Sequence, residues 1–364
     1  MQNYFIMHNE NRVASVRSDG RCRIYSRRLM PYNLYLDDAE DLDTRLNNLS
    51  NFLYWCASRI LTLDRKYAKE ILNSLGKKQA VTDRDRAEIA ISYHALSLTD
   101  VFWVRQHRES VKFADINLYS HSLSDSFVDV SLRGKNLTAE NAELLNPLDA
   151  AGDVATQGVA PKAWIRREGR FYLIKDGERR DVEAELLASR ILDCFDVDHV
   201  RYFAQNYNGL KVSCSEMITS LQRSIAAIEY IDIYAQNNDL DFYKMVIGLD
   251  PQGYYSMNIM DYLVGNTDRH WSNWGVWVDN RNNKITGLHP LMDFNKSFSA
   301  YDSVDGAICQ TAPGKVSQKS AAIEAVRIIG LNQIAEVQED WFENKDDWHM
   351  FNKRLAILKS AEKK

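Results

Sequence analysis

Residues 261–298 read DYLVGNTDRHWSNWGVWVDNRNNKITGLHPLMDFNKSF, and three polar residues within them organise the interpretation of the whole chain. Asp268 is followed by Asn273 five positions later, and Asp293 comes twenty positions after Asn273, just before Phe294. Carboxylate and amide oxygens are the ligands that Mg²⁺ takes from proteins, and water or phosphate completes its shell. The spacing therefore predicts two Mg²⁺ ligands, Asn273 and Asp293, with a further carboxylate nearby.

The interval from Asp268 to Asn273 is that of the protein-kinase catalytic loop, after which an Asp-Phe-Gly supplies the other metal ligand. The flanks differ here, with Asp-Arg-His in place of His-Arg-Asp and Asp-Phe-Asn in place of Asp-Phe-Gly. These residues resemble the HipA-like kinases, bacterial relatives of the protein-kinase fold that share the Asp-Arg-His order with phosphatidylinositol kinases. The resemblance implies an α+β, bilobal protein-kinase-like fold with an N-terminal strand and helix subdomain and a mostly helical C-terminal lobe.

The segments on either side of Asn280–Asn283, WGVWVD and KITGLHPLMDF, predict a hairpin that brings Asn273 and Asp293 to adjacent strand ends. Asp268 is expected to accept or orient the proton of the acceptor hydroxyl. His270 is expected either to approach the phosphates of ATP or to be a buried structural histidine. For Arg269, a fixed ion pair and a phosphate contact both fit the sequence.

Composition limits the class of protein. The chain has 364 residues, 45% hydrophobic and 26% charged, as in ordinary globular proteins, and its length suggests about two domains. A net charge of −5 gives no basic footprint, so we expect no direct binding of nucleic acid. No apolar run reaches the roughly 18 residues of a membrane span, and five scattered cysteines predict free thiols in a reducing cytoplasm. The expected location is cytoplasmic.

Along the chain, three parts are predicted. Residues 1–150 form an N-terminal subdomain, with strands that turn at Asn9–Asn11 and Ser18–Gly20, then helices from Asp37 to about His107, and a loop-rich segment over 108–150. Residues 151–220 form an ATP-binding lobe of strands and one helix. Residues 221–364 form a helical C-terminal lobe that carries the catalytic and metal-binding loops.

The sequence GDVATQGVAPKAW, residues 152–164, predicts a glycine-containing turn between strands. Glycine permits close backbone approach, so such a turn can direct N–H groups towards phosphate oxygens, although many ordinary turns carry the same glycines. The residues expected to bind ATP here are Thr156, Gln157, Gly158 and Val159. In HipA-like kinases a serine of this loop can be autophosphorylated, and Thr156 is the nearest hydroxyl in this chain.

Two further charged residues fit a nucleotide site. A predicted strand, Phe171–Lys175, ends on a lysine that would neutralise phosphate charge. The next segment, DVEAELLASRILDCFDV, predicts an amphipathic helix with Glu183 and Glu185 near its start. Glu185 matches the family pattern for the partner of Lys175, whereas Glu183 suits a helix N-terminus. The strand pair that follows turns at Asn206–Gly209.

After that strand pair, Glu216, Met217 and Ile218 fall where the hinge of a kinase would meet adenine through backbone groups. Residues 220–263 are predicted to be helical, leading directly into the loop that holds Asp268. Together these features predict an ATP- and Mg²⁺-dependent kinase for a Ser or Thr hydroxyl on a protein. The resemblance further implies the toxin of a toxin–antitoxin system, with a small DNA-binding antitoxin as partner.

Two alternatives stay open on the residues alone. A kinase for a lipid or a small molecule would share the Asp-Arg-His order, although no basic amphipathic helix for a membrane surface is present. A nucleotide-binding regulator, or pseudokinase, would act by binding a partner without turnover. The full set of Lys175, Asp268, Asn273 and Asp293 favours an enzyme.

Overall fold

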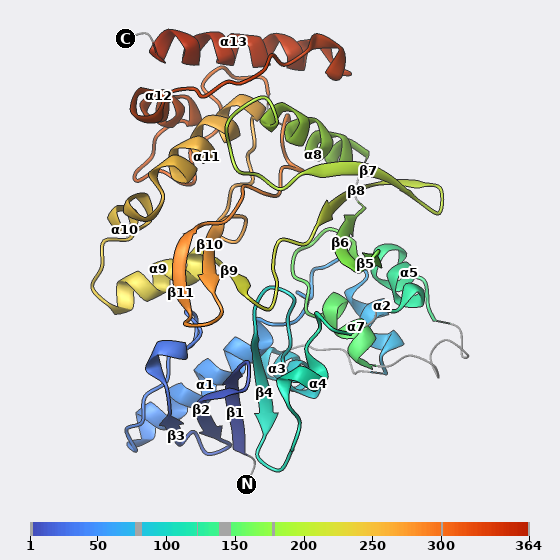
Figure 1. Cartoon of the computed structure of the whole chain (residues 1–364), viewed down its shortest axis with the longest axis vertical. Helices are drawn as coiled ribbons and strands as arrows, with labels where there is room; N and C mark the ends of the chain where they lie inside the picture. Colours follow the sequence, from blue (N-terminus) through green and yellow to red (C-terminus); the bar gives the residue numbers. More distant parts are fainter. Residues whose placement is uncertain are drawn as a thin grey trace. The chain divides into compact units, whose positions relative to one another are not determined.

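The computed structural model describes residues 3–76, 82–121, 123–137, 147–176, 179–299 and 301–362. The chain divides into two compact units, each built from three separate segments (Figure 1). Unit 1 comprises Met1–Lys175, Met217–Ala226 and Val278–Ile285, and unit 2 comprises Asp176–Glu216, Ala227–Trp277 and Thr286–Lys364. The three-part division at residues 150 and 220 stays a prediction.

Unit 1 begins with an antiparallel sheet in the order β3-β2-β1-β4. Its strands are β1 (Asn3–His8), β2 (Asn11–Arg17), β3 (Cys22–Ile24) and β4 (Phe102–Gln106). The predicted hairpin turn between β1 and β2 is confirmed, with Asn9 at a positive φ of 49°. The prediction of helix as far as His107 is wrong at its end, because β4 pairs with β1, a strand about a hundred residues earlier.

The other elements of the N-terminal part are mainly helices. They are η1 (Arg27–Leu29), α1 (Leu42–Ala57), α2 (Ala68–Ser74), α3 (Asp83–Ser92), α4 (Phe113–Ile116), α5 (Asp125–Arg133) and α7 (Pro147–Val154). Helix α1 packs against α3 and β2, and Phe52 and Trp55 of α1 are fully buried in one continuous core. Helix α3 starts with a capping box formed by Thr82 and Asp85. The segment 108–150 is more helical than its turn-rich sequence predicted.

A second hairpin of unit 1, β5 (Lys162–Arg167) and β6 (Arg170–Lys175), carries the strand lysine. Its turn falls at Glu168 and Gly169, both at positive φ. Helices α5 and α7 pack against β5. The antiparallel register places Lys162 opposite Lys175, so both lysines stand at the open end of the hairpin.

Unit 2 opens with α8 (Arg179–Leu192), which packs on the hairpin of β7 (Tyr202–Tyr207) and β8 (Leu210–Glu216). The predicted helix and the predicted hairpin turn, with Asn208 and Gly209 at positive φ, are both confirmed.

The remaining strands belong to one small sheet. It comprises β9 (Arg223–Ala227), β10 (Gly275–Asp279) and β11 (Lys284–Leu288), in the order β11-β10-β9. Segment 220–263 was predicted to be helical throughout, and this is wrong over β9. The sequence RSIAA shows neither a helical nor a strand periodicity, and the strand that it pairs with lies far along the chain. The predicted hairpin through Asn280–Asn283 is confirmed.

Helix α11 (Pro251–Val264) packs against several other helices of unit 2 (Figure 1). The remaining helices of this unit are α9 (Ile228–Asn237), α10 (Phe242–Leu249), α12 (Gln318–Ile329), η2 (Glu339–Trp341) and α13 (Lys345–Glu362). Helix α11 contacts α8, α10, α12 and α13, and its last seven residues are all buried. Among the helices in the described ranges, none combines the length and the hydropathy needed to cross a bilayer.

Candidate active site

Helix α11 delivers the loop that contains Asp268. The helix begins with Asp250 as N-cap and Pro251 in the first turn, and it ends at Gly265, whose φ is 62°. A Cβ atom at Gly265 would lie 2.5 Å from the ring of Tyr301, so only glycine fits at this point. The end of the helix is therefore fixed, and the polar loop starts at Asn266.

Arg269 forms a buried ion pair inside this loop. Its Nε and Nη2 atoms donate to the two carboxylate oxygens of Asp261, each at 2.9 Å. Its Nη1 atom donates to the carbonyl of Asn273 at 2.8 Å and to that of Met292 at 2.5 Å. Of the two sequence interpretations, the fixed ion pair is thus confirmed. The guanidinium thus links the backbone of Asn273, one predicted metal ligand, to that of Met292, the residue before Asp293, the other.

Asn273 is oriented by a single hydrogen bond. Its Nδ2 atom donates to the backbone carbonyl of Asp268 at 2.8 Å, and the side chain is largely buried. Because the amide nitrogen is held there, the Oδ1 atom is directed away from that carbonyl. Oδ1, the only atom of this side chain that can bind a metal ion, therefore points away from the Asp268 carbonyl.

Asp293 has an unusual backbone conformation. Its φ is 61°, in the left-handed region that residues other than glycine seldom adopt, and its N–H donates to the hydroxyl of Tyr202 at 3.1 Å. Residues held in this region often lie at functional sites. The conformation and the tyrosine together fix the direction in which the carboxylate leaves the chain.

Asp268 is a partly buried carboxyl close to Asp293 and His270. Partial burial raises the pKa of Asp268 above its ordinary value, and the negative charge of Asp293 adds to this, while His270 and Lys296 oppose it. The Nε2 atom of His270 lies 3.9 Å from the Asp268 carboxylate, and its Nδ1 atom contacts the hydroxyl of Ser272 at 2.8 Å. His270 is exposed, so the structure contradicts its interpretation as a buried histidine.

The loop with Gly158 differs from the prediction. It follows helix α7, not a strand, and Gly152 lies within that helix. Gly158 does have a positive φ, of 97°, and a Cβ atom there would lie 2.4 Å from the Nζ atom of Lys162. Lys162 thus reaches the glycine of the loop from the first residue of β5.

Thr156 is engaged within its own loop. Its hydroxyl donates to the carbonyl of Gly152 at 2.6 Å and accepts from the indole nitrogen of Trp164 at 2.8 Å. A hydroxyl with both hydrogen-bonding directions used would have to leave these partners before accepting phosphate. Autophosphorylation at Thr156 therefore stays an untested prediction that this geometry disfavours.

Other contacts hold the same loop on the segment between α1 and α2. Arg65 donates from Nη1 to the carbonyls of Asp153 and Thr156, each at 2.9 Å, and from Nη2 to that of Lys162 at 2.6 Å. Gln157 donates to the carbonyl of Ser58. The carbonyl of Val159 accepts from the N–H of Lys66 at 3.0 Å, although the Val159 side chain is exposed.

The two glutamates of α8 have different surroundings. Glu185 is almost fully buried, and the hydroxyl of Ser213 donates to its carboxylate at 2.5 Å. Glu183 forms an ion pair of 2.6 Å with Lys211. Lys175 is buried at the end of β6 in unit 1, whereas Glu185 belongs to unit 2, so the pairing of Lys175 with Glu185 stays a prediction.

The predicted hinge begins where β8 ends, at Glu216. The N–H of Met217 already donates to the carbonyl of Phe171 at 2.9 Å. It cannot therefore donate to adenine at the same time, and the hinge would use other backbone groups of Glu216, Met217 and Ile218.

Several residues of the site were missed in the sequence. Asp261 carries a signal that could have been used, since an aspartate inside the apolar run SMNIMDYLV needs a buried partner. Tyr202 and Arg65 carry none, because each contacts segments about ninety residues away.

The predicted metal ligands suit a hard cation. Within the described residues, no group of three or more His, Cys, Asp and Glu side chains is placed to hold a metal ion. Mg²⁺ commonly takes only one or two protein oxygens and completes its octahedron with water and substrate phosphates. One carboxylate and one amide oxygen fit that requirement, whereas they would not make a closed structural site for zinc.

Comparison with known proteins supports the fold assignment. No protein-family model matches the chain, and no curated protein matches it in sequence. Among solved structures, the chain is similar to HipA of Shewanella oneidensis MR-1, whose structure is a toxin–antitoxin complex with HipB and operator DNA. The TM-score is 0.54 at 11% identity, and the match covers 98% of this chain and 97% of that one. The proinflammatory kinase CtkA of Helicobacter pylori matches with a TM-score of 0.43 at 12% identity, over 56% of this chain and 93% of that one.

The match to HipA extends over nearly the whole of both chains. The predicted α+β class and HipA-like kinase fold are therefore confirmed.

Proposed function

We propose that this chain is an ATP- and Mg²⁺-dependent HipA-like kinase that phosphorylates a Ser or Thr hydroxyl on a protein. The observation that carries the proposal is the grouping of Asp268, Asn273 and Asp293 around the buried pair of Arg269 and Asp261. The HipA-like fold supports the same reading. The proposed location is the cytoplasm, because ATP is readily supplied there.

The residues would share the work in the following way. Asn273, through Oδ1, and Asp293, through its carboxylate, would hold Mg²⁺, which when bound neutralises charge on the phosphates. Asp268 would orient the acceptor hydroxyl and receive its proton as the oxygen bonds to the γ-phosphorus and ADP leaves. Lys175 and the backbone around Gly158 would hold the phosphates.

The raised pKa of Asp268 suits that task. A carboxylate with an ordinary pKa is a very weak base at neutral pH, and burial beside Asp293 makes this one a better proton acceptor. Arg269 would act through position alone, because its donors are directed to Asp261 and to two carbonyls.

The test is phosphoryl transfer from γ-labelled ATP with Mg²⁺, first to the chain itself and then to candidate proteins. We expect label with the wild type and a loss of at least about 100-fold with Asp268→Asn or Asp293→Asn. The control is Asp279→Asn, which alters an aspartate of the same hairpin that pairs with the exposed Arg281. Full transfer by Asp268→Asn would refute the assignment.

Two outcomes would favour the alternatives. Transfer to a lipid or a small molecule, with none to protein, would identify a different acceptor. Binding of ATP with no transfer to any acceptor would favour a nucleotide-binding regulator.

The proposal includes a small DNA-binding antitoxin as partner. Its support is that the HipA structure holds HipB and operator DNA. Co-purification with the product of an adjoining gene would test it.

A further inference from the structure

The segment Met217–Ala226, which we call the linker, directly follows the last residue of β8. It belongs to unit 1, together with the N-terminal 175 residues, although the strand before it belongs to unit 2. Two of the three predicted hinge residues, Met217 and Ile218, open the linker. The contacts that hold the linker therefore also set the position of the backbone groups that would meet adenine.

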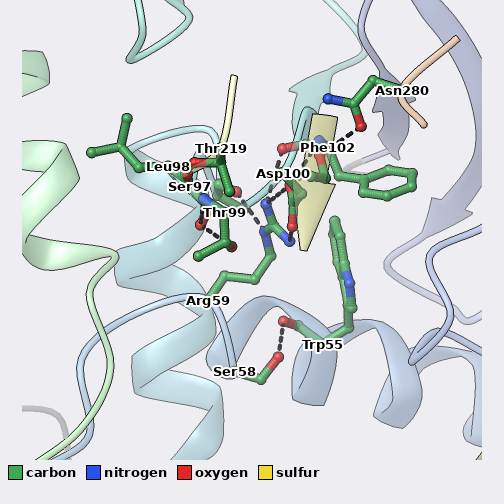
Figure 2. Close-up of polar contacts among 12 residues, drawn as sticks. Trp55, Ser58, Arg59, Ser97, Leu98, Thr99, Asp100, Phe102, Thr219 and Asn280 are labelled. Carbon is green, nitrogen blue, oxygen red and sulfur yellow. Dashed lines mark hydrogen bonds and ion pairs between the residues drawn. The ribbon is translucent and has the colours of Figure 1, made fainter. Parts of the chain in front are cut away.

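The loop between α3 and β4 bonds to the linker at two points. The hydroxyl of Thr219 donates to the carbonyl of Leu98 at 2.5 Å, and the N–H of Ile225 donates to the carbonyl of Thr99 at 3.0 Å. Figure 2 shows Thr219 lying directly beside Leu98 and Thr99. Thr219 is buried, and Leu98 also accepts a hydrogen bond of 3.1 Å from the hydroxyl of Tyr119.

This loop is itself held rigidly by Arg59 of the N-terminal part. The guanidinium makes a two-pronged ion pair with Asp100, at 2.8 and 2.7 Å (Figure 2). It also donates to the carbonyls of Ala95 at 2.6 Å and Phe102 at 3.0 Å, which lie at the two ends of the loop. The ring of Trp55 lies 4.7 Å from the guanidinium carbon. A buried, forked contact of this kind leaves the loop few alternative conformations.

The other side of the linker is held by Asn280 at the tip of the β10–β11 hairpin. Its Nδ2 atom donates to the carbonyls of Ser220 at 3.1 Å and Leu221 at 3.2 Å, and its N–H donates to that of Gln222 at 3.0 Å. Its Oδ1 atom accepts from the hydroxyl of Ser224 at 2.6 Å. Asn280 was predicted only as a hairpin turn residue, and the structure shows that it binds the linker from Ser220 to Ser224.

We propose that Thr219 is a positioning residue for base recognition, through which the N-terminal subdomain fixes the hinge of the nucleotide site. The chain of contacts runs from Arg59 to the loop Ala95–Phe102 and from Leu98 to Thr219, next to Ile218. This inference rests on the proposed function, since it assumes that the hinge backbone meets adenine. It assigns the N-terminal subdomain a part in nucleotide selection.

The experiment compares two variants that each remove one hydroxyl donor from the same acceptor, the carbonyl of Leu98. Thr219→Val removes the donor on the linker, and Tyr119→Phe removes the other donor, whose hydroxyl also interacts with that of Thr219. Either change leaves that carbonyl with one partner, so neither exposes an unsatisfied buried group. Binding of ATP, GTP and inorganic tripolyphosphate is measured by calorimetry with Mg²⁺, and melting temperatures confirm that each variant is folded.

We expect Thr219→Val to weaken ATP binding about three- to tenfold, the equivalent of one hydrogen bond, and to reduce the preference for ATP over GTP. Tripolyphosphate has no base, so its binding should be unchanged. Tyr119→Phe and Thr219→Ser, which keeps the donor, should bind ATP as the wild type does.

Three results would contradict the inference. Equal ATP binding by wild type and Thr219→Val would overturn it while leaving the kinase proposal intact. An equal loss for ATP and tripolyphosphate would show a general structural effect and would also overturn it. A wild-type chain that binds no ATP would overturn the proposed function itself, and the inference with it.

Discussion

Arg269 illustrates how a buried charge can organise a site without touching a substrate. Burying an ion pair removes both groups from water, and the loss is offset only where the geometry is good and further hydrogen bonds are made. Asp261 takes two of the five guanidinium N–H donors, two carbonyls take two more, and the ring of Phe294 lies 4.9 Å away. Four of the five donors thus hold Asp261 and the backbone on both sides of the site.

Asp153 is another buried charged residue, and it makes stability depend on pH. Burial raises the pKa of Asp153 from 3.8 to about 7, opposed by Arg65 and by the N–H of Trp164, which donates to its carboxylate. The folded state thus favours the neutral carboxyl. Its contribution to stability is complete below about pH 4 and is lost as the pH rises to about 7.

We predict that Asp153→Asn removes this part of the pH dependence. The amide keeps an oxygen acceptor for Trp164 and does not ionise. The free energy of unfolding, measured with urea from pH 5 to 8, should fall less steeply for the variant, which should gain relative to wild type as the pH rises. Parallel curves for the two proteins would show that Asp153 is ionised throughout this range.

For single residues, the sequence predicted those whose chemical role depends on their spacing along the chain. Asp268, Asn273 and Asp293 were predicted from their intervals, and the structure brings them together. Glu185 is buried and Glu183 pairs with Lys211, and the pairing of Glu185 with Lys175 stays a prediction. Arg65 and Thr219 were not predicted, because their importance comes from partners far away in sequence, and a lone Arg or Thr has no periodicity to mark it.

Elements were predicted well where a helical period or a local turn marks them. Helix α8 and the hairpins β7–β8 and β10–β11 lie where expected. Strands β4 and β9 were missed because each pairs with a strand far away in the sequence, and short apolar runs are ambiguous between helix and strand. The first two leucines of α1, Leu42 and Leu46, follow helical spacing and yet are 64% and 58% exposed, so periodicity found the helix without finding its buried face.

Asn283, at the tip of the β10–β11 hairpin, contacts the N-terminal segment. Its φ is 57°, its Nδ2 atom donates to the carbonyl of Met30 at 2.7 Å, and its own carbonyl accepts from the hydroxyl of Tyr32 at 2.8 Å. Asparagine tolerates the left-handed conformation better than other non-glycine residues do. The side chain thus suits both the turn and the contact with the N-terminal segment.

We predict that Asn283→Ala and Asn283→Gly both destabilise the fold, and that alanine is worse by about 1 kcal/mol. Both lose the hydrogen bond to Met30, at about 0.5–1.5 kcal/mol, but only alanine is strained at positive φ. Urea midpoints of the two variants would separate the contributions. Equal losses would mean that the turn relaxes out of the left-handed region.

At the scale of the whole molecule, the chain passes five times between the two units, at residues 175, 216, 226, 277 and 285. A linear division of the sequence could not reveal this. The contacts within the chain group residues 1–175 with two short, distant segments in one unit.

This discontinuity predicts that residues 1–175 do not form a stable fold by themselves. Without the linker and the hairpin tip, the carbonyls of Met30, Thr99 and Phe171 lose hydrogen-bond donors that the full chain supplies. Each lost hydrogen bond costs about 0.5–1.5 kcal/mol, and together these are a substantial part of the roughly 5–15 kcal/mol that stabilises a typical domain.

The measurement is thermal unfolding, followed by circular dichroism, of the fragment 1–175 and of a joined chain. In the joined chain, flexible Gly/Ser linkers connect the fragment to residues 217–226 and 278–285. We expect cooperative unfolding of the joined chain, and a broad transition at lower temperature for the fragment. If both unfold at the same temperature, the two short segments contribute nothing to unit 1, and its stability lies entirely in the N-terminal sheet and helices.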